Sequence, residues 1–133
     1  MADGLGWLGL ARRGGNLALG EGNTRAALRL GMARLVLVAS DASEGARRRA
    51  EGYVFEPGVP LTVAPYTKEQ IADMVGKTGC SMAAFLDTGL AAAFLAALRE
   101  EFGEEYGPLA EAFQERLRRR SKSGNAGKRR KRA

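Results

Sequence analysis

Apolar residues recur along the chain in short runs with two different spacings, and glycine or proline separates most of these runs. Leu5, Leu8 and Leu10 have the spacing of a short amphipathic helix, which the Gly14-Gly15 pair is expected to close. The run RLVLVAS at 34–40 is β-branched and apolar on both faces. It therefore predicts a central strand of a sheet that is covered on both sides.

Shorter strands and helices alternate through the rest of the first hundred residues. The other predicted strands lie at 16–19, 60–65 and 80–86. The helices between them begin at side chains that can cap a helix N-terminus: Asn23 or Thr24, Ser43, Thr67, and Asp87 or Thr88. Gly31 and Gly76 are expected to end two of these helices. This order predicts the α/β class, as a three-layer α/β/α sandwich with a four-stranded mixed sheet and right-handed crossovers.

The pattern changes after residue 98. Beyond the Gly107-Pro108 break, apolar residues spaced by four at Leu109, Phe113 and Leu117 predict one further, exposed helix. SKSGNAG at 121–127 has the composition of a flexible link. We therefore expect a domain at 1–98, an acidic then basic helical extension at 99–120, and a flexible basic tail at 121–133.

Positive charge is concentrated at the C-terminal end. The net charge is +6, but residues 116–132 hold ten Lys or Arg and no acid, whereas residues 1–115 hold 11 bases and 15 acids. Such a basic run binds nucleic acid through counterion release, although a nuclear-import signal or a solubility tail has the same composition. Nine cations are expected to make nonspecific phosphate contacts: Arg118, Arg119, Arg120, Lys122, Lys128, Arg129, Arg130, Lys131 and Arg132.

The composition excludes several kinds of site. With no His and one Cys, the chain holds no Ser-His-Asp or Cys-His centre, no zinc or iron-sulfur cage and no intrachain disulfide. Asp41 with Lys77 is the only pair that an enzyme hypothesis can nominate, so we predict no enzyme, no catalytic residue, no metal and no cofactor. The start lacks a basic region ahead of its apolar residues, and no apolar run approaches the ~18 residues that span a bilayer. These features predict a cytoplasmic protein with no membrane partner.

Two features of the chain leave a functional and a structural interpretation open. Gly20-Glu21-Gly22 feeds a predicted helix, and such a turn either presents backbone amides to a phosphate or base edge or only shapes the chain. Asp41 follows the central strand, where α/β proteins often hold functional residues, but a capping role explains it equally well.

Arg47, Arg48 and Arg49 point about 100° apart on a helix and so cannot form one patch.

A linked series of segments resembles a known family. LGLARRGGNLALGEGNTRAALRLGMARLVLVASDAS, VPLTVAPYTKEQIADMVGKTG and AAFLDTGLAAAFL, spread over residues 5–98, are similar to the YlxQ-like bacterial branch of the ribosomal L-seven-Ae and L-thirty-e superfamily. The similarity includes Gly20 before a helix, Gly31 after it, and Val75-Gly76-Lys77. It implies an α/β/α sandwich that binds RNA, in many members a kink-turn.

The resemblance also implies a site, made by the helix start at 20–29 and the loop at 77–81. Gly22, Asn23 and Ala26 stand where family members have the Asn, Glu and Lys that read the kink-turn, and Asn16 stands where the family often has Lys. Asn23 and Arg25 are candidate replacements, and Arg29 lies one turn further along the same helix. The expected RNA-binding residues are Asn16, Gly20, Glu21, Gly22, Asn23, Arg25, Arg29, Asp41, Lys77, Thr78 and Gly79.

Two hypotheses follow from different classes. The first is a monomeric, non-enzymatic RNA-binding protein, associated with the ribosome, in which the tail adds nonspecific affinity. The second is a protein-interaction module of the translation or transcription machinery, motivated by the loss of a cation at Ala26 and by the acids at 100–105.

Overall fold

The structure is a computed structural model that describes the backbone of residues 2–132 and the side chains of residues 2–120. The helices are α1 (Gly4–Arg13), α2 (Glu21–Arg29), α3 (Glu44–Phe55), α4 (Lys68–Val75), α5 (Thr88–Phe102) and α6 (Gly107–Arg132), with a 3-10 turn, η1, at Glu104–Tyr106. The strands are β1 (Leu17–Leu19), β2 (Leu35–Val38), β3 (Leu61–Val63) and β4 (Met82–Phe85). Their order in the sheet is β1-β4-β2-β3, and only the β2–β3 pair is parallel.

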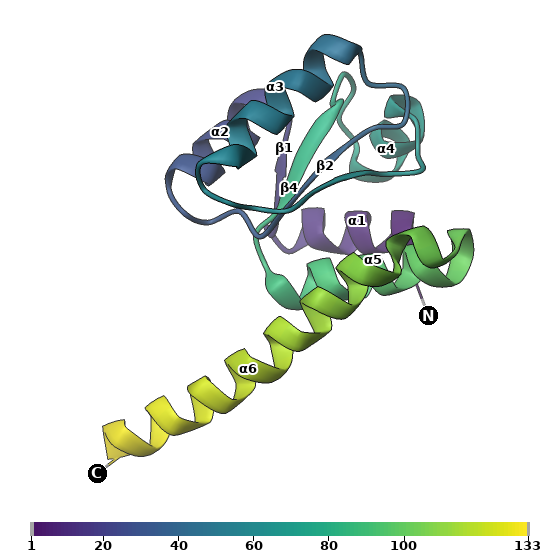
Figure 1. The fold of residues 1–133 in the computed structure, drawn as a ribbon. Coiled ribbons are helices and arrows are strands. Elements are labelled where there is room, and N and C mark those ends of the chain that lie inside the picture. The colour runs from purple at the N-terminus through teal and green to yellow at the C-terminus, as the bar shows by residue number, and fades with distance from the viewer. Residues whose placement is uncertain (1, 133) are drawn as a thin grey trace.

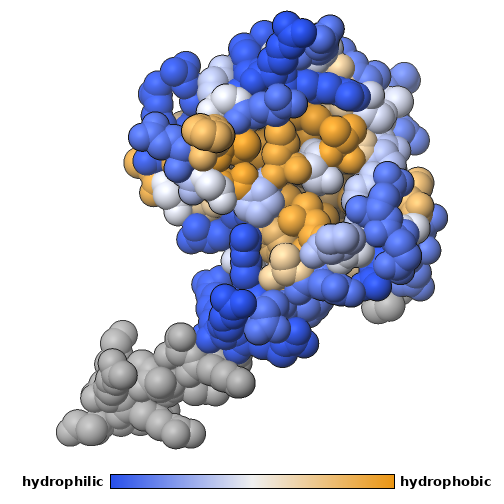
Figure 2. Space-filling view, in the orientation of Figure 1, coloured by the Kyte–Doolittle hydropathy of each residue, from blue (hydrophilic) through white to orange (hydrophobic). Residues whose placement is uncertain are grey.

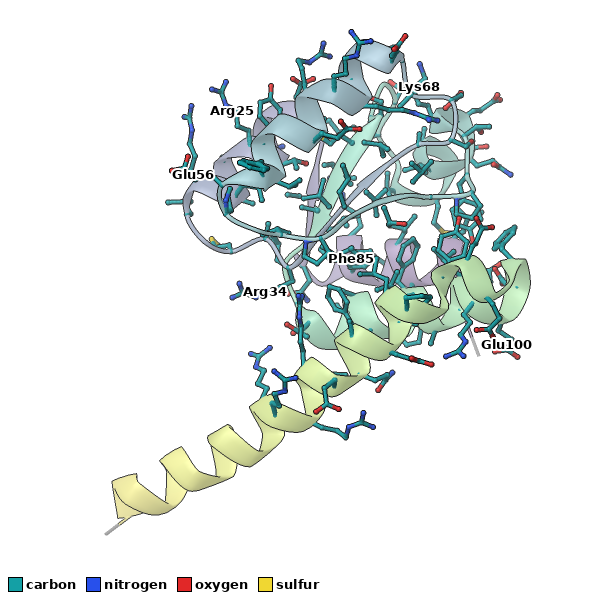
Figure 3. All side chains as sticks on the ribbon, viewed as in Figure 1. Arg25, Arg34, Glu56, Lys68, Phe85 and Glu100 are labelled. Atoms are coloured by element: carbon teal, nitrogen blue, oxygen red, sulfur yellow. The ribbon has the colours of Figure 1, made fainter. Side chains whose placement is uncertain are left out.

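Helices cover both faces of this mixed sheet, which confirms the predicted sandwich. α2 and α3 lie on one face, while α1, α4 and α5 pack together on the other (Figure 1). Every residue of β2 and β4 is buried between the two layers. Phe85 of β4, near the centre of Figure 3, packs its ring 4.9 Å from that of Phe94. Burial on both faces explains why residues 35–39 are an uninterrupted apolar run.

Local capping sets most helix boundaries as the sequence predicts. Thr67 and Gln70 form a complete capping box at α4, and Gly76 ends that helix with a left-handed conformation. Ser43 and Asp87 cap α3 and α5. The predicted start of α2 is wrong, because Gly20 is the N-cap, with φ of +87°, and the helix begins at Glu21. The Asn23 amide instead donates to the Leu19 carbonyl at 2.9 Å and ties α2 to β1.

The segment after residue 98 is packed into the fold. The predicted helix after Gly107-Pro108 is confirmed as α6, but its predicted exposure is wrong, because Phe113 is 0% exposed and Ala110 is also buried. α6 packs along α5, and the Tyr106 hydroxyl donates to the Val63 carbonyl at 3.2 Å. The backbone of α6 continues to Arg132, beyond the predicted link. The side chains from 121 onward, including Lys122 and the cations at 128–132, lie outside the described part, so the basic tail stays a prediction.

The outer edge of β3 carries apolar surface. Figure 2 shows apolar side chains in the middle of the face that is drawn, framed by polar ones. β3 is an edge strand, and Val63 is 41% exposed. Pro60 and Pro65 flank it. Because proline has no N–H to donate, the two residues limit how far another strand can pair along this edge.

None of the helices in the described part of the chain is both long enough and apolar enough to cross a membrane.

Candidate nucleic-acid interface

Three loops meet at one end of the sheet. The Gly20 amide donates to the Met82 carbonyl at 2.9 Å, and the Ala39 amide donates to the Ser81 carbonyl at 2.9 Å. These bonds join the turn after β1, the turn after β2 and the loop before β4. The helix start at Gly20 and the loop at 77–81, which the family resemblance assigned to one site, are therefore adjacent.

The start of α2 presents backbone rather than side chain. No side chain caps this helix, so its first N–H groups can donate to an anion or a base edge. A methyl group added at Gly20 or Gly22 would meet nothing within 4 Å, so both positions face open space. A ligand can therefore approach the backbone at the start of α2 closely, but Gly22 offers it no side-chain donor.

Lys77, Thr78 and Gly79 are exposed in the neighbouring loop, and Gly79 has φ of +77°. Lys77 lines a groove of about 290 Å³ along the outer edge of β1, which we name the β1 groove. Its other lining residues include Arg12, Asn23, Ala26, Leu30 and Met32. Leu30 is 73% exposed and Met32 is 47% exposed, so this groove is largely apolar with cations at its rim.

Glu21 forms hydrogen bonds with two side chains of α3. Its carboxylate accepts from the Arg49 Nε at 2.8 Å, the Arg49 Nη2 at 3.1 Å and the Tyr53 hydroxyl at 2.6 Å. The bonds from Arg49 and then Tyr53 hold the pKa of Glu21 below its usual value. The bond to Glu21 is also the main cause that raises the pKa of the Tyr53 hydroxyl. Glu21 therefore links α2 to α3, a role that its place in the Gly-rich turn does not reveal.

Arg25 and Arg29 lie on the opposite side of α2 from Asn23. The Arg25 guanidinium carbon lies 5.2 Å from the centre of the Tyr53 ring. Both arginines line a second groove, of about 470 Å³, which we name the α2–α3 groove. The structure thus divides the expected RNA-binding side chains of α2 between two surfaces.

Asp41 lies in the turn after β2 at the loop end of the sheet, but neither Asp41 nor Asn16 lines either groove. Asp41 Oδ1 accepts from the Lys68 amide at 2.9 Å, so it holds the start of α4 to the turn after β2, in line with the structural interpretation. The Asn16 carbonyl accepts from the Leu86 amide at 2.9 Å. Asn16 is therefore at the other end of β1 from Gly20.

The three consecutive arginines of α3 take separate partners, as their helical spacing predicts. Arg47 donates to the Ser40 carbonyl at 2.8 Å, Arg48 pairs with Glu44 at 2.6 Å, and Arg49 pairs with Glu21. Within residues 2–120, no three His, Cys, Asp or Glu side chains gather as a metal site would require.

Sequence reasoning missed several residues of both grooves, namely Arg12, Leu30, Met32, Tyr53 and Glu56. For Leu30 and Met32 the sequence did carry a signal, because these two large apolar residues flank Gly31, where α2 was expected to end. Tyr53 carried no signal, because its partner Glu21 is 32 residues away.

The fold and this cluster of loops define a class, the α/β/α domains that present a glycine-rich helix start beside the loop before the last strand. Residues 2–94 match the model of the ribosomal protein L7Ae/L30e/S12e/Gadd45 family, and the chain belongs to this family. A solved structure described as a protein with unknown function from Bacillus halodurans C has a TM-score of 0.66 and 24% sequence identity to this chain. The similarity covers 74% of this chain and 98% of that one, and it shows a shared fold. No curated protein matches the chain.

Proposed function

We propose that this protein is a non-enzymatic, ribosome-associated RNA-binding protein of the bacterial cytoplasm, from the YlxQ-like branch of its family. One observation carries the proposal: the uncapped start of α2 and the exposed Lys77 loop are joined by backbone hydrogen bonds at one end of the sheet, in a member of a family of ribosomal proteins. This end contacts structured RNA. The amides of α2 and the Lys77 amine donate to phosphates and base edges.

A kink-turn is the first RNA to test, because the family resemblance points to it. Gly22 and Ala26 supply no donor, so recognition rests on backbone amides, Asn23 and Lys77. We therefore expect a preference for the kink-turn that is carried by few side chains and lost when one of them is removed.

The test compares a kink-turn RNA with a straight duplex of equal length, at two salt concentrations. The chain is used in full and also ending after Glu115, which removes the basic end but keeps buried Phe113. The truncated chain should still prefer the kink-turn, and Lys77→Ala should reduce this preference, while Arg13→Ala, which removes an exposed cation of α1, should leave it unchanged. Equal, weak binding to both RNAs by the truncated chain would contradict the proposal.

The apolar character of the β1 groove favours a second candidate, a protein-interaction module. Ala26, Leu30 and Met32 place aliphatic surface beside Asn23, where a phosphate would need cations. In this function the basic end alone binds RNA, without sequence choice. Leu30→Asp would then abolish association with ribosomes or transcription complexes while leaving RNA affinity unchanged, which a sedimentation assay can measure.

A further inference from the structure

The α2–α3 groove is separate from the loops of the proposed interface. It lies between the outer sides of the two helices, and its lining includes Arg25, Leu28, Arg29, Tyr53, Glu56 and Pro57. Figure 3 shows Arg25 and Glu56 on the same side of the molecule, beside these helices. Arg25, which lines the groove, is one helical turn from Glu21 at the start of α2.

A chain of contacts holds Arg25 in place. Arg49 fixes the Glu21 carboxylate, that carboxylate fixes the Tyr53 hydroxyl, and the Arg25 guanidinium lies over the Tyr53 ring. The guanidinium carbon lies over the aromatic ring, 5.2 Å from its centre, so Arg25 is held beside Tyr53 at the groove wall. A guanidinium can stack on a flat group, and guanidinium planes are a common platform for unpaired RNA bases.

Arg29 follows Arg25 on the same side of α2, with Cβ atoms about 6 Å apart at this spacing. It is exposed, and it adds a second positive charge to the same wall. Leu28 and Pro57 supply apolar surface, and a Cβ added at Gly52 would meet nothing within 4 Å. Apolar surface beside two guanidinium groups suits a base with its phosphate.

Glu56 is the one acid among the residues that line this groove. Its carboxylate repels phosphate, so it disfavours a long anionic strand over a short one.

We propose that the α2–α3 groove binds a short single-stranded segment flanking the structured RNA, with a base stacked on Arg25 and a phosphate on Arg29. The inference rests on the proposed function, because the flank is delivered by the RNA held at the loop end. An unpaired segment is required, since the bases of a duplex are stacked on each other and cannot reach the guanidinium. The two arginines give the charge complementarity that favours RNA.

The test uses the full chain and one RNA hairpin, with and without a short unpaired flank at each end in turn. For the natural sequence, the flank should raise affinity about 5- to 150-fold, the range expected for one stacked base. Arg25→Ala with Arg29→Ala should remove this gain and leave affinity for the bare hairpin close to that of the natural sequence. Glu56→Gln should increase the gain, a result that loss of folding cannot produce.

A matched control removes two other exposed cations, Arg13→Ala with Lys68→Ala, and should keep the gain. If the flank gives no gain in affinity, or if both double variants reduce the gain equally, the inference about the α2–α3 groove is wrong. Binding of the hairpin by the interface would be unaffected by that result. Failure of the proposed function is a different result, namely equal, weak binding of the kink-turn RNA and the straight duplex by the chain that ends after Glu115.

A second measurement does not depend on the hairpin. A short unpaired oligonucleotide alone should shift the amide resonances of Gly31 and Gly52, which line the groove. Shifts confined to residues 77–81, or shifts at the groove produced equally by an acidic peptide, would also overturn the inference.

Discussion

Neighbouring residues at the start of α2 contact different parts of the molecule. Glu21 binds α3, Gly22 faces open space, Asn23 holds the Leu19 carbonyl, and Arg25 lies over Tyr53. The segment at 20–29, which the sequence assigns to one RNA-binding site, therefore holds side chains that point in several directions. At this scale, what a residue can bind depends on which partner already occupies it.

The Glu21 cluster makes stability depend on pH with a definite sign. The folded-state pKa of Glu21 is lowered, so its ionised form stabilises the fold above the unfolded-state pKa, and this stabilisation is lost as the pH falls through the folded value. Glu21→Gln should therefore be less stable than the natural sequence at neutral pH, and the difference should shrink as the pH falls through the lowered folded-state pKa of Glu21. Urea unfolding at several pH values measures it. A difference that is independent of pH would show that Glu21 contributes only packing.

Gly20 and Gly22 give a matched pair of substitutions. Gly20 has φ of +87°, so Gly20→Ala should destabilise the protein by about 1–3 kcal/mol, although the added methyl meets no neighbour. Gly22 is helical and equally open, so Gly22→Ala should stabilise by up to about 1 kcal/mol. Thermal unfolding of both variants tests the pair, and equal effects would contradict the assignment of Gly20 as the N-cap.

At the scale of elements, α6 completes the helical layer that α5 begins. Phe113 is fully buried, and Arg99 of α5 pairs with Glu104 at 2.9 Å and with Glu111 at 3.5 Å. The family match ends at residue 94, before this packing. The extension is therefore structural up to Phe113, whatever its last residues bind.

Substituting one buried and one exposed phenylalanine distinguishes the loss of packing on α5 from the loss of an aromatic ring as such. Phe113→Ala should cost about 3–5 kcal/mol, because it removes a buried ring from the contact between α5 and α6. Phe55→Ala is the control, since Phe55 is 86% exposed and its loss should change stability by less than about 0.5 kcal/mol. Denaturant unfolding gives both values. Similar effects of the two substitutions would mean that α6 does not pack on α5 in solution.

In the whole molecule, charge is divided between a body with more acids than bases and a basic end. α6 runs past α5 and away from α2 and α3 (Figure 1). The basic end therefore leaves the body on the face opposite the α2–α3 groove. Two separate RNA contacts on one chain would raise the overall affinity through effective concentration.

Salt dependence separates these contacts. If about six cations of the basic end neutralise phosphates, log K for single-stranded RNA should fall with log salt at a slope near about −4 for the full chain. The chain ending after Glu115 should give a much shallower slope, as measured by fluorescence anisotropy over a salt series. A full-length chain with the five cations at 128–132 replaced by Gln controls for length. An unchanged slope after truncation would place the phosphate contacts on the body.

The sequence by itself determined the alternation of elements, the mixed sandwich and most helix ends. Capping boxes, C-terminal glycines and apolar periods act over about four residues, so they can be read locally. Helical spacing alone also puts Asn23 and Arg25 on opposite sides of α2.

Only the tertiary structure decided what those sides face. Glu21 meets Arg49 and Tyr53 from 28 and 32 residues away. Phe113 is buried where α6 packs on α5, a contact that no local pattern in the sequence predicts. Spacing within a helix fixes the direction of a side chain, but its partner depends on how helices pack across the sheet. That packing decides whether an arginine is free for RNA or held by a neighbouring helix.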